Sequence, residues 1–253
     1  MEAREAAQIA LNCLDLTSLN DNDDATAIDA LCRRALTSWG PVAAVCVWPR
    51  FVAQARAALP GSVAVAAVAN FPAGSLDMAL ALADTRTIVS AGGDEVDLVL
   101  PWRSMLGGEA AAAADLVRVV RAACPQQRLK LIIESGELPL PETIRQASRI
   151  GLEAGVDFLK TSTGKTAHGA SLDAARLMLE CIAMQPRAVG FKASGGIRTV
   201  TDTAVYIELV RALLGDGALS SQRLRFGASG LLGDIERVLS GSHGAGTAPA
   251  SVY

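Results

Sequence analysis

Lysine and histidine are scarce in this 253-residue chain, which holds four lysines against nineteen arginines and only two histidines. Its five cysteines are scattered and show no CxxC spacing. With so few clustered metal ligands, we expect no structural zinc site and no metal or other cofactor. An odd, unpatterned set of cysteines favours free thiols in a reducing compartment, so we expect a cytoplasmic protein.

The sequence also lacks a strong charge of one sign and any long apolar run. Its net charge of −3, without blocks of like charge, provides no general surface for nucleic acid. The start, MEAREAAQIA, is charged and does not resemble a secretion signal. The longest uncharged stretch, Ala57–Leu76, contains two prolines and two glycines, which predict strand and loops instead of a membrane helix. We therefore expect neither nucleic acid nor a membrane as a partner.

Short apolar runs alternate with longer segments of helical period along most of the chain. The runs predict eight strands, at Leu14–Thr17, Ala43–Trp48, Val63–Asn70, Glu95–Pro101, Arg128–Glu134, Phe158–Ser162, Ala188–Ser194 and Arg223–Ser229. The segments between and after them predict eight helices, at Asp23–Trp39, Pro49–Leu59, Leu76–Ala91, Glu109–Cys124, Pro141–Ala154, Leu172–Met184, Thr201–Leu214 and Leu231–Leu239.

This alternation predicts an α/β fold with parallel strands and outer helices. Eight strand–helix units in about 250 residues are typical of a single (β/α)8 TIM barrel. We assign residues 1–239 to the barrel catalytic domain. The remaining residues, 240–253, are small and polar, and we expect a flexible C-terminal tail.

Charged residues occur on the predicted inner face of three strands. Alternation along each strand places Asp97, Lys160 and Lys192 toward the barrel interior, where active sites lie at the carboxyl ends of strands. Burying these charges is costly unless they are paired or functional. A structural ion-pair cluster is one interpretation. Lys130 and Glu134 share a face of the fifth strand and are a candidate supporting pair near Lys160.

A catalytic interpretation is sharper, because a neutral lysine amine attacks carbonyl groups. Lowering a lysine pKa from about 10.4 to near neutrality requires about 4 kcal/mol of differential destabilisation of the ammonium form. Burial and a neighbouring cation both act in that direction, and arginine forms no Schiff base. One inner lysine is then the nucleophile and the other its cationic neighbour, while Asp97 transfers protons directly or through water.

Three predicted strands end in glycine-rich segments, TSTGK (161–165), ASGGIR (193–198) and GASGLLGD (227–234). Successive backbone N–H groups in such turns bind anions, and barrels commonly bind phosphate at the loops after their last two strands. Tight βα turns are the usual explanation for one such loop. Three at matching strand ends favour a phosphorylated ligand, to which Lys165 and Arg198 add positive charge.

These segments resemble the signatures of the deoxyribose-phosphate aldolase family. DFLKTSTGK, GFKASGGIRT and RFGASGLLGDI carry the resemblance, as do LDLTSLND, CVWPRF, NFPAG and DEVDLVLP, in order along almost the whole chain. The resemblance implies a TIM-barrel Schiff-base aldolase that needs no metal. Such an enzyme reversibly cleaves 2-deoxy-D-ribose 5-phosphate to D-glyceraldehyde 3-phosphate and acetaldehyde.

By match to the family motifs, Lys160 is the Schiff-base lysine, Lys192 the second lysine and Asp97 the acid/base partner. The C-terminal Tyr253 is a further catalytic candidate, for proton transfer. The substrate-binding positions implied by the resemblance are Asp15, Thr17, Cys46, Thr163, Gly164, Lys165, Gly195, Gly196, Gly227 and Ser229. Gly230 departs from the Ser-Ser pattern of near relatives and removes one hydroxyl from the last phosphate loop.

Two alternatives remain open from the residues. One is another Schiff-base aldolase or transaldolase acting on a related phosphosugar. The other is a phosphosugar-binding barrel without catalysis. Among partners we expect small phosphorylated sugars and aldehydes, with a homodimer as the candidate assembly.

Overall fold

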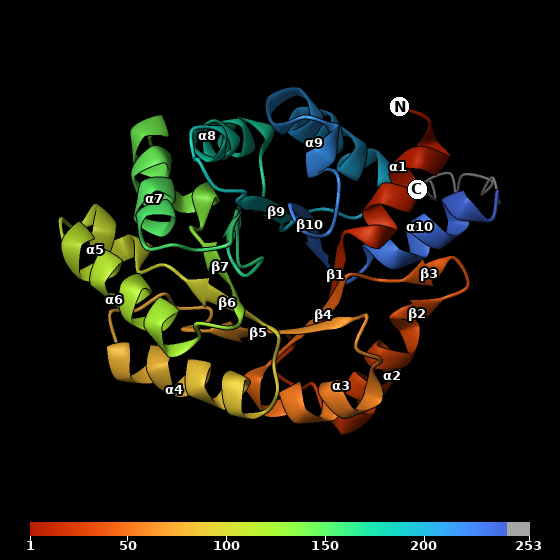
Figure 1. Ribbon diagram of the computed structural model, residues 1–253, viewed down its shortest axis with the longest axis horizontal. Helices are drawn as coiled ribbons and strands as arrows, with labels where there is room; N and C mark the ends of the chain where they lie inside the picture. The colour runs from red at the N-terminus through yellow and green to blue at the C-terminus, as the bar shows by residue number, and fades with distance from the viewer. Residues whose placement is uncertain (242–253) are drawn as a thin grey trace, which may run out of the picture.

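Eight parallel strands close into a barrel in the computed structural model of the protein, which describes residues 1–241 (Figure 1). Their order around the barrel is β1-β10-β9-β8-β7-β6-β5-β4. The strands are β1 (Leu14–Thr17), β4 (Ala44–Val47), β5 (Ala64–Ala69), β6 (Glu95–Val99), β7 (Arg128–Ile132), β8 (Phe158–Lys160), β9 (Gly190–Ser194) and β10 (Leu224–Ala228). The predicted TIM barrel and all eight of its strands are confirmed.

The barrel is surrounded by a ring of helices (Figure 1). They are α1 (Ala3–Asn12), α2 (Ala25–Arg34), α3 (Val52–Ala58), α4 (Met78–Ser90), α5 (Trp102–Leu106), α6 (Ala110–Ala123), α7 (Pro141–Glu153), α8 (Leu172–Ala183), α9 (Val200–Leu214) and α10 (Leu231–Leu239). Short 3-10 turns lie at η1 (Pro49–Phe51), η2 (Ser135–Glu137) and η3 (Asp216–Ala218). No helix of residues 1–241 has both the length and the apolar character needed to cross a bilayer.

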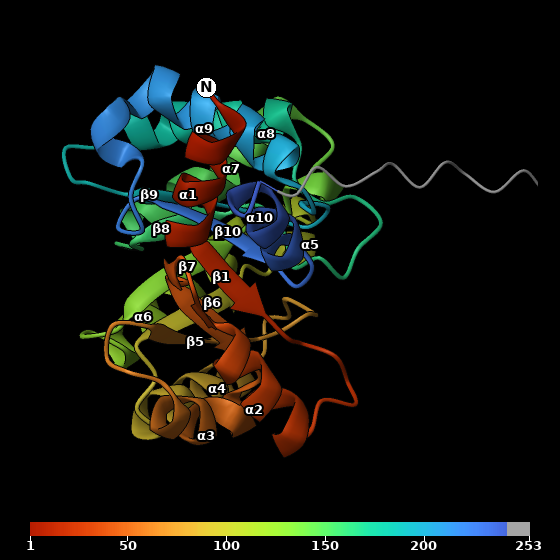
Figure 2. The ribbon, with the colours of Figure 1, turned by 90° about the vertical axis from the view of Figure 1, so that its right-hand side faces the viewer.

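The N-terminal helix α1 was not predicted. Its buried stripe consists of Ala6, Ala7, Ala10 and Leu11, and small alanines give a weak apolar signal in a charged segment. The helix packs against α9 and α10, beside the junction where β1 pairs with β10 (Figure 2). It thereby covers the place where the first and last strands of the barrel meet.

The prediction of one helix over Asp23–Trp39 was wrong after Arg34. Helix α2 begins after Asp24, whose side chain accepts a hydrogen bond from the Ala27 backbone N–H, and it ends at Arg34. The chain then forms a small hairpin of β2 (Leu36–Thr37) and β3 (Gly40–Pro41). Gly40, the first residue of β3, has φ of 116°, a conformation that favours glycine.

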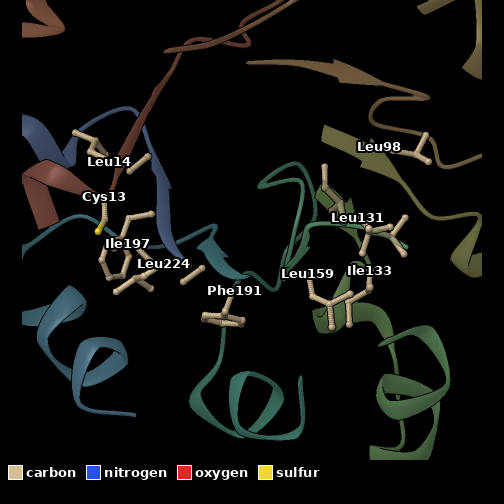
Figure 3. Packing of buried hydrophobic residues seen from close by; sticks show 14 of the residues in the cluster. Cys13, Leu14, Leu98, Leu131, Ile133, Leu159, Phe191, Ile197 and Leu224 are labelled. Atoms are coloured by element: carbon tan, nitrogen blue, oxygen red, sulfur yellow. The ribbon is translucent and has the colours of Figure 1, made fainter. Parts of the chain in front are cut away.

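The main apolar core lies between the strands and the helices. Figure 3 shows Leu131, Leu159 and Phe191 projecting from β7, β8 and β9 toward the helical layer, and all three are fully buried. Burying one such side chain stabilises the fold by roughly 1.5–3 kcal/mol. Because alternate residues of each strand point to opposite faces, this outward packing turns Lys130, Lys160 and Lys192 toward the barrel axis. The fold thus places the lysines where the site forms.

Candidate active site

Seven ionisable side chains that are at most 3% exposed meet inside the barrel. This buried charge cluster consists of Asp15, Glu95, Asp97, Lys130, Lys160, Lys192 and Arg225. Each member lies on the inward face of its strand. Asp15 is on β1, and Glu95 and Asp97 are two residues apart on β6. The four cations lie one each on β7, β8, β9 and β10. The predicted interior charges are therefore part of a larger network.

Asp97 joins the three lysines. Its Oδ1 accepts a hydrogen bond from Lys130 Nζ at 2.8 Å. Its Oδ2 accepts from Lys160 Nζ at 2.9 Å and from Lys192 Nζ at 2.8 Å. Lys192 also contacts Asp15, and Lys130 contacts Asp15 and Glu95. Lys160 therefore contacts one carboxylate oxygen, which it shares with Lys192. Lys130 and Lys192 each contact at least two carboxylates.

This difference in partners gives the lysines opposite pKa shifts. Burial lowers the pKa of Lys160, the Lys192 charge lowers it further, and the single contact with Asp97 does not restore it. Burial would also lower the pKa of Lys192, but Asp15 and Asp97 outweigh it and raise that pKa above its ordinary value. The pKa of Lys130 is raised for the same reason, with Asp15, Asp97 and Glu95 as the partners. Lys160 is thus the amine most easily freed of its proton.

The charge count within the cluster agrees with this order. Three carboxylates face four cations when every member is ionised, and three when Lys160 is neutral. Burial alone would raise the pKa of Asp97, but the three lysines hold it well below its ordinary value. A buried excess positive charge is costly. Lys160 has the fewest carboxylate contacts of the four cations, so its ammonium group is the one that loses a proton most easily.

Two glycines make room for large side chains inside the barrel. Gly190 is the register partner of Phe158, and a side chain on it would overlap the Phe158 ring. A Cβ on Gly227 would lie 2.9 Å from the Cε atom of Lys192. The glycines of β9 and β10 therefore leave the space that the Phe158 ring and the Lys192 stem occupy in the barrel interior.

A cavity of about 460 Å³ opens above the cluster at the carboxyl ends of the strands. Lys160 lines it from below, together with residues of the loops after β1, β8, β9 and β10. Gly164, Gly195 and Gly196 all have positive φ values, between 76° and 87°, in the turns that form one wall. Lys165 and Arg198 also line this wall, so it combines glycine turns with two cationic side chains.

Nine predicted site residues border this cavity, namely Thr17, Lys160, Thr163, Gly164, Lys165, Gly195, Gly196, Gly227 and Ser229. Asp15, Asp97 and Lys192 do not line it and lie buried in the cluster below. Cys46 is also buried, in a small apolar group with Leu19, Ala66 and Val68, and its Sγ lies 4.0 Å from Asp97 Oδ2. Tyr253 lies outside the described residues.

The expected pair of Lys130 and Glu134 does not form. Lys130 points into the charge cluster, whereas the chain turns at Glu134, whose φ is 51°, and its carboxylate accepts hydrogen bonds from Thr163. The strand prediction ran too far here, because β7 ends at Ile132. Once the chain leaves the strand, alternation no longer determines where a side chain points.

Sequence reasoning missed Glu95 and Arg225. Both positions carried a signal: Glu95 lies two residues before Asp97, and Arg225 lies two residues before Gly227, so each shares the inward face. In the structure Arg225 pairs with Asp15 and Glu95 at the floor of the cluster. All three carboxylates are engaged by cations, and residues 1–241 contain no group of three or more His, Cys or acidic side chains suited to a metal ion.

Comparisons with known proteins agree on one family. The family model described as DeoC/LacD family aldolase matches residues 9–231. A curated protein from Agrobacterium fabrum, named deoxyribose-phosphate aldolase, is 45% identical over 241 residues, which cover 94% of this chain and 93% of that protein. Two solved structures share the fold.

The first, a provisionally assigned deoxyribose-phosphate aldolase from Coccidioides immitis, is 29% identical, has a TM-score of 0.81 and matches 94% of this chain and 88% of its own. The second, with the same provisional assignment, comes from Toxoplasma gondii ME49. It is 23% identical, has a TM-score of 0.86, matches 95% of this chain and 98% of its own, and supports the fold alone. On its sequence, its barrel and its buried lysines, the chain belongs to the DeoC/LacD family of aldolases.

Proposed function

We propose that the protein cleaves 2-deoxy-D-ribose 5-phosphate reversibly to D-glyceraldehyde 3-phosphate and acetaldehyde, through a Schiff base on Lys160. The observation that carries this proposal is the buried Lys160 amine, which shares one Asp97 oxygen with Lys192 and has a lowered pKa, at the base of a cavity walled by the glycine-containing loops after β8, β9 and β10. The name of the Agrobacterium relative supports the choice of substrate.

The chemistry follows from the arrangement of the lysines. Neutral Lys160 adds to the C1 aldehyde of the open-chain sugar, and loss of water gives an iminium ion. The iminium draws the electrons of the C2–C3 bond as that bond breaks, and the C3 hydroxyl loses its proton to give the aldehyde of D-glyceraldehyde 3-phosphate. The remaining enamine gains a proton at C2, and hydrolysis then releases acetaldehyde and regenerates Lys160.

Lys192 and Asp97 have separate tasks in this scheme. The Lys192 ammonium lowers the pKa of Lys160 and, with its raised pKa, stays charged throughout. Asp97 orients both amines through one oxygen and, by way of water in the cavity, receives the C3 hydroxyl proton. A role for Tyr253 in protonating the enamine stays a prediction.

The phosphate group fits the wall formed by Gly164, Lys165, Gly195, Gly196 and Ser229. Helix α10 begins at Leu231, directly after the cavity residues Ser229 and Gly230, so the positive end of its dipole lies at the same wall. Gly230 lacks the hydroxyl of the serine in the family pattern, but its backbone N–H group is still present in this loop.

A turnover assay tests this function. The purified protein is incubated with 2-deoxy-D-ribose 5-phosphate, and acetaldehyde and D-glyceraldehyde 3-phosphate are measured, with ribose 5-phosphate as the control substrate. We expect equal amounts of the two products from the deoxy sugar. Strong activity with a ketose donor and none with acetaldehyde would indicate a different Schiff-base aldolase or transaldolase. Stabilisation by the phosphosugar without turnover would indicate a binding protein.

Two further expectations concern the location and the assembly of the protein. All five cysteines are buried as free thiols, which supports a cytoplasmic location. The homodimer stays a prediction, and analytical ultracentrifugation of the full chain would test it.

A further inference from the structure

Glu134 is a buried carboxylate that belongs to no ion pair within residues 1–241. It lies just beyond β7, and its φ of 51° is one of two positive values among the described residues other than glycine. Such backbone is strained for a side chain of this size and persists where the surroundings hold it. The carboxylate contacts the loop after β8, which carries the cavity residues Thr163, Gly164 and Lys165.

All the hydrogen-bond partners of Glu134 in this loop are donors. The Thr163 backbone N–H donates to Oε1 at 3.1 Å, and the Thr163 hydroxyl donates to Oε2 at 2.6 Å. The Thr166 hydroxyl lies 3.4 Å from Oε1. Both oxygens of the carboxylate therefore serve as acceptors, and Thr163 and Thr166 are the donors in these contacts.

The bonds of Thr163 determine what its hydroxyl can offer a ligand. A threonine hydroxyl has one hydrogen to donate and two lone pairs to accept with. Its hydrogen is directed to Glu134, and one lone pair accepts from the Lys165 backbone N–H at 3.0 Å. One lone pair is left, and Thr163 lines the cavity. Toward a ligand, Thr163 is therefore an acceptor, and its partner must be a donor.

The position of Thr163 indicates which donor it meets. In the proposed function, Lys160 holds the carbonyl carbon of the substrate, and the glycine turns with Lys165 hold the phosphate; both groups of residues line the cavity. Thr163 lies between Lys160 and Lys165 in the chain and lines the same cavity. In a five-carbon sugar phosphate the donor between these ends, apart from the hydroxyl that reacts, is the C4 hydroxyl. The same group is the 2-hydroxyl of the three-carbon aldehyde.

We propose that Glu134 is a positioning residue that fixes Thr163 as a hydrogen-bond acceptor and thereby makes the site select phosphorylated aldehydes with a hydroxyl next to the carbonyl. This inference rests on the proposed function, because it concerns the acceptor aldehyde of the same reaction. An acceptor lacking that hydroxyl leaves the Thr163 lone pair unsatisfied.

The test compares two acceptors in the synthetic direction with acetaldehyde as donor. They are D-glyceraldehyde 3-phosphate and 3-oxopropyl phosphate, which differ only by the 2-hydroxyl. The quantity measured is the ratio of their kcat/KM values. Glu134→Leu removes the acceptor, and Glu134→Gln is the conservative control that keeps one oxygen for Thr163. Thr163→Val and Thr163→Ser form a second matched pair.

For the natural chain we expect a ratio of about ten or more in favour of the hydroxylated aldehyde, the size of one well-formed hydrogen bond. The ratio should fall to near one in Glu134→Leu and Thr163→Val, and remain high in Glu134→Gln and Thr163→Ser. A merely structural role would lower both kcat/KM values equally, because both acceptors carry the phosphate.

Several outcomes would overturn the inference. A ratio near one in the natural chain is the first, and an unchanged ratio in Glu134→Leu is the second. The third is an unchanged ratio in Thr163→Val, and this variant provides the test if Glu134→Leu does not fold. Absence of turnover with both acceptors in the natural chain would contradict the proposed function itself. These results are therefore distinguishable.

Discussion

At the scale of single residues, the reactivity of Lys160 depends on two features of its surroundings: it has few carboxylate partners, and it has a charged lysine neighbour. Asp97 Oδ2 is divided between Lys160 and Lys192, and the second lysine has Asp15 in addition. A lysine with a full carboxylate of its own would keep its proton at neutral pH. The site therefore separates nucleophile from neighbour by unequal sharing of anions.

Replacing the neighbour should move the pH dependence of the reaction. In Lys192→Leu, the positive charge that helps to lower the pKa of Lys160 is gone, so this pKa rises. We expect a lower kcat and a kcat/KM profile whose acidic limb moves to higher pH. Lys165→Met is the matched control, because Lys165 lines the cavity and donates to the Leu19 carbonyl outside the cluster. It should weaken phosphosugar binding and leave the limb in place.

The third lysine offers a test of charge balance. In Lys130→Met, three buried carboxylates lose their shared cation, and removing one partner of a buried pair typically costs about 3–5 kcal/mol. Lys160 then becomes the compensating cation, so its pKa should rise and activity should fall. The double variant Lys130→Met/Glu95→Gln restores the balance and should recover part of both losses. Equal losses in the single and double variants, in denaturant unfolding and in kcat, would refute the balance argument.

The extent to which the site could be predicted differs from residue to residue. Alternation along the strands was enough to place Asp97, Lys160 and Lys192 in the interior. The same rule applies to Glu95 and Arg225, which lie on inward faces nearer the N-terminal ends of β6 and β10. Glu134 could not be placed in this way, because its position depends on a left-handed turn after the strand that no local pattern indicates.

At the scale of elements, packing between neighbouring strands decides which residues can occupy β9. Gly190 faces the buried Phe158 ring of β8, and a methyl group there would overlap rigid aromatic atoms. We expect Gly190→Ala to lower the free energy of unfolding by roughly 1–3 kcal/mol or more, through overpacking. Gly217→Ala is the matched control, since nothing lies within 4 Å of the added carbon. Similar melting temperatures for the two variants would contradict the packing argument.

The elements also show why some boundaries were predictable and others were not. Strong apolar runs determined the eight strands of the barrel. The hairpin after Arg34 was missed because Leu36 continues the apolar period of α2, although the chain has already turned. Helix α1 was missed because its buried face is mostly alanine. In both cases contacts with other elements decided the structure, and the local sequence did not reveal them.

At the scale of the whole molecule, the buried cluster couples stability to pH. Burial alone would raise the pKa values of Asp15, Glu95 and Asp97, but the lysines and Arg225 lower all three below their ordinary 3.8 to 4.5. A carboxylate with a lowered pKa in the folded state stabilises it above its unfolded pKa, and this stabilisation is lost as the pH falls through the folded value.

We therefore expect the melting temperature to be nearly constant around neutral pH and to fall steeply below about pH 4. Differential scanning calorimetry across this range measures the effect. The double variant Lys130→Met/Glu95→Gln has one buried carboxylate fewer and should lose less stability in acid. A melting temperature that does not depend on pH between 3 and 5 would show that these carboxylates are not held by the cluster.

The central claim is that Lys160, and neither Lys192 nor Lys165, forms the covalent intermediate. Reduction with borohydride in the presence of acetaldehyde, followed by peptide mass mapping, tests it most directly. Lys160→Arg, which keeps the positive charge but cannot form an imine, is the control and should show neither adduct nor turnover. The account predicts an ethyl group on Lys160 alone. An adduct on another lysine, or an unmodified Lys160 in protein that still turns over, would contradict it.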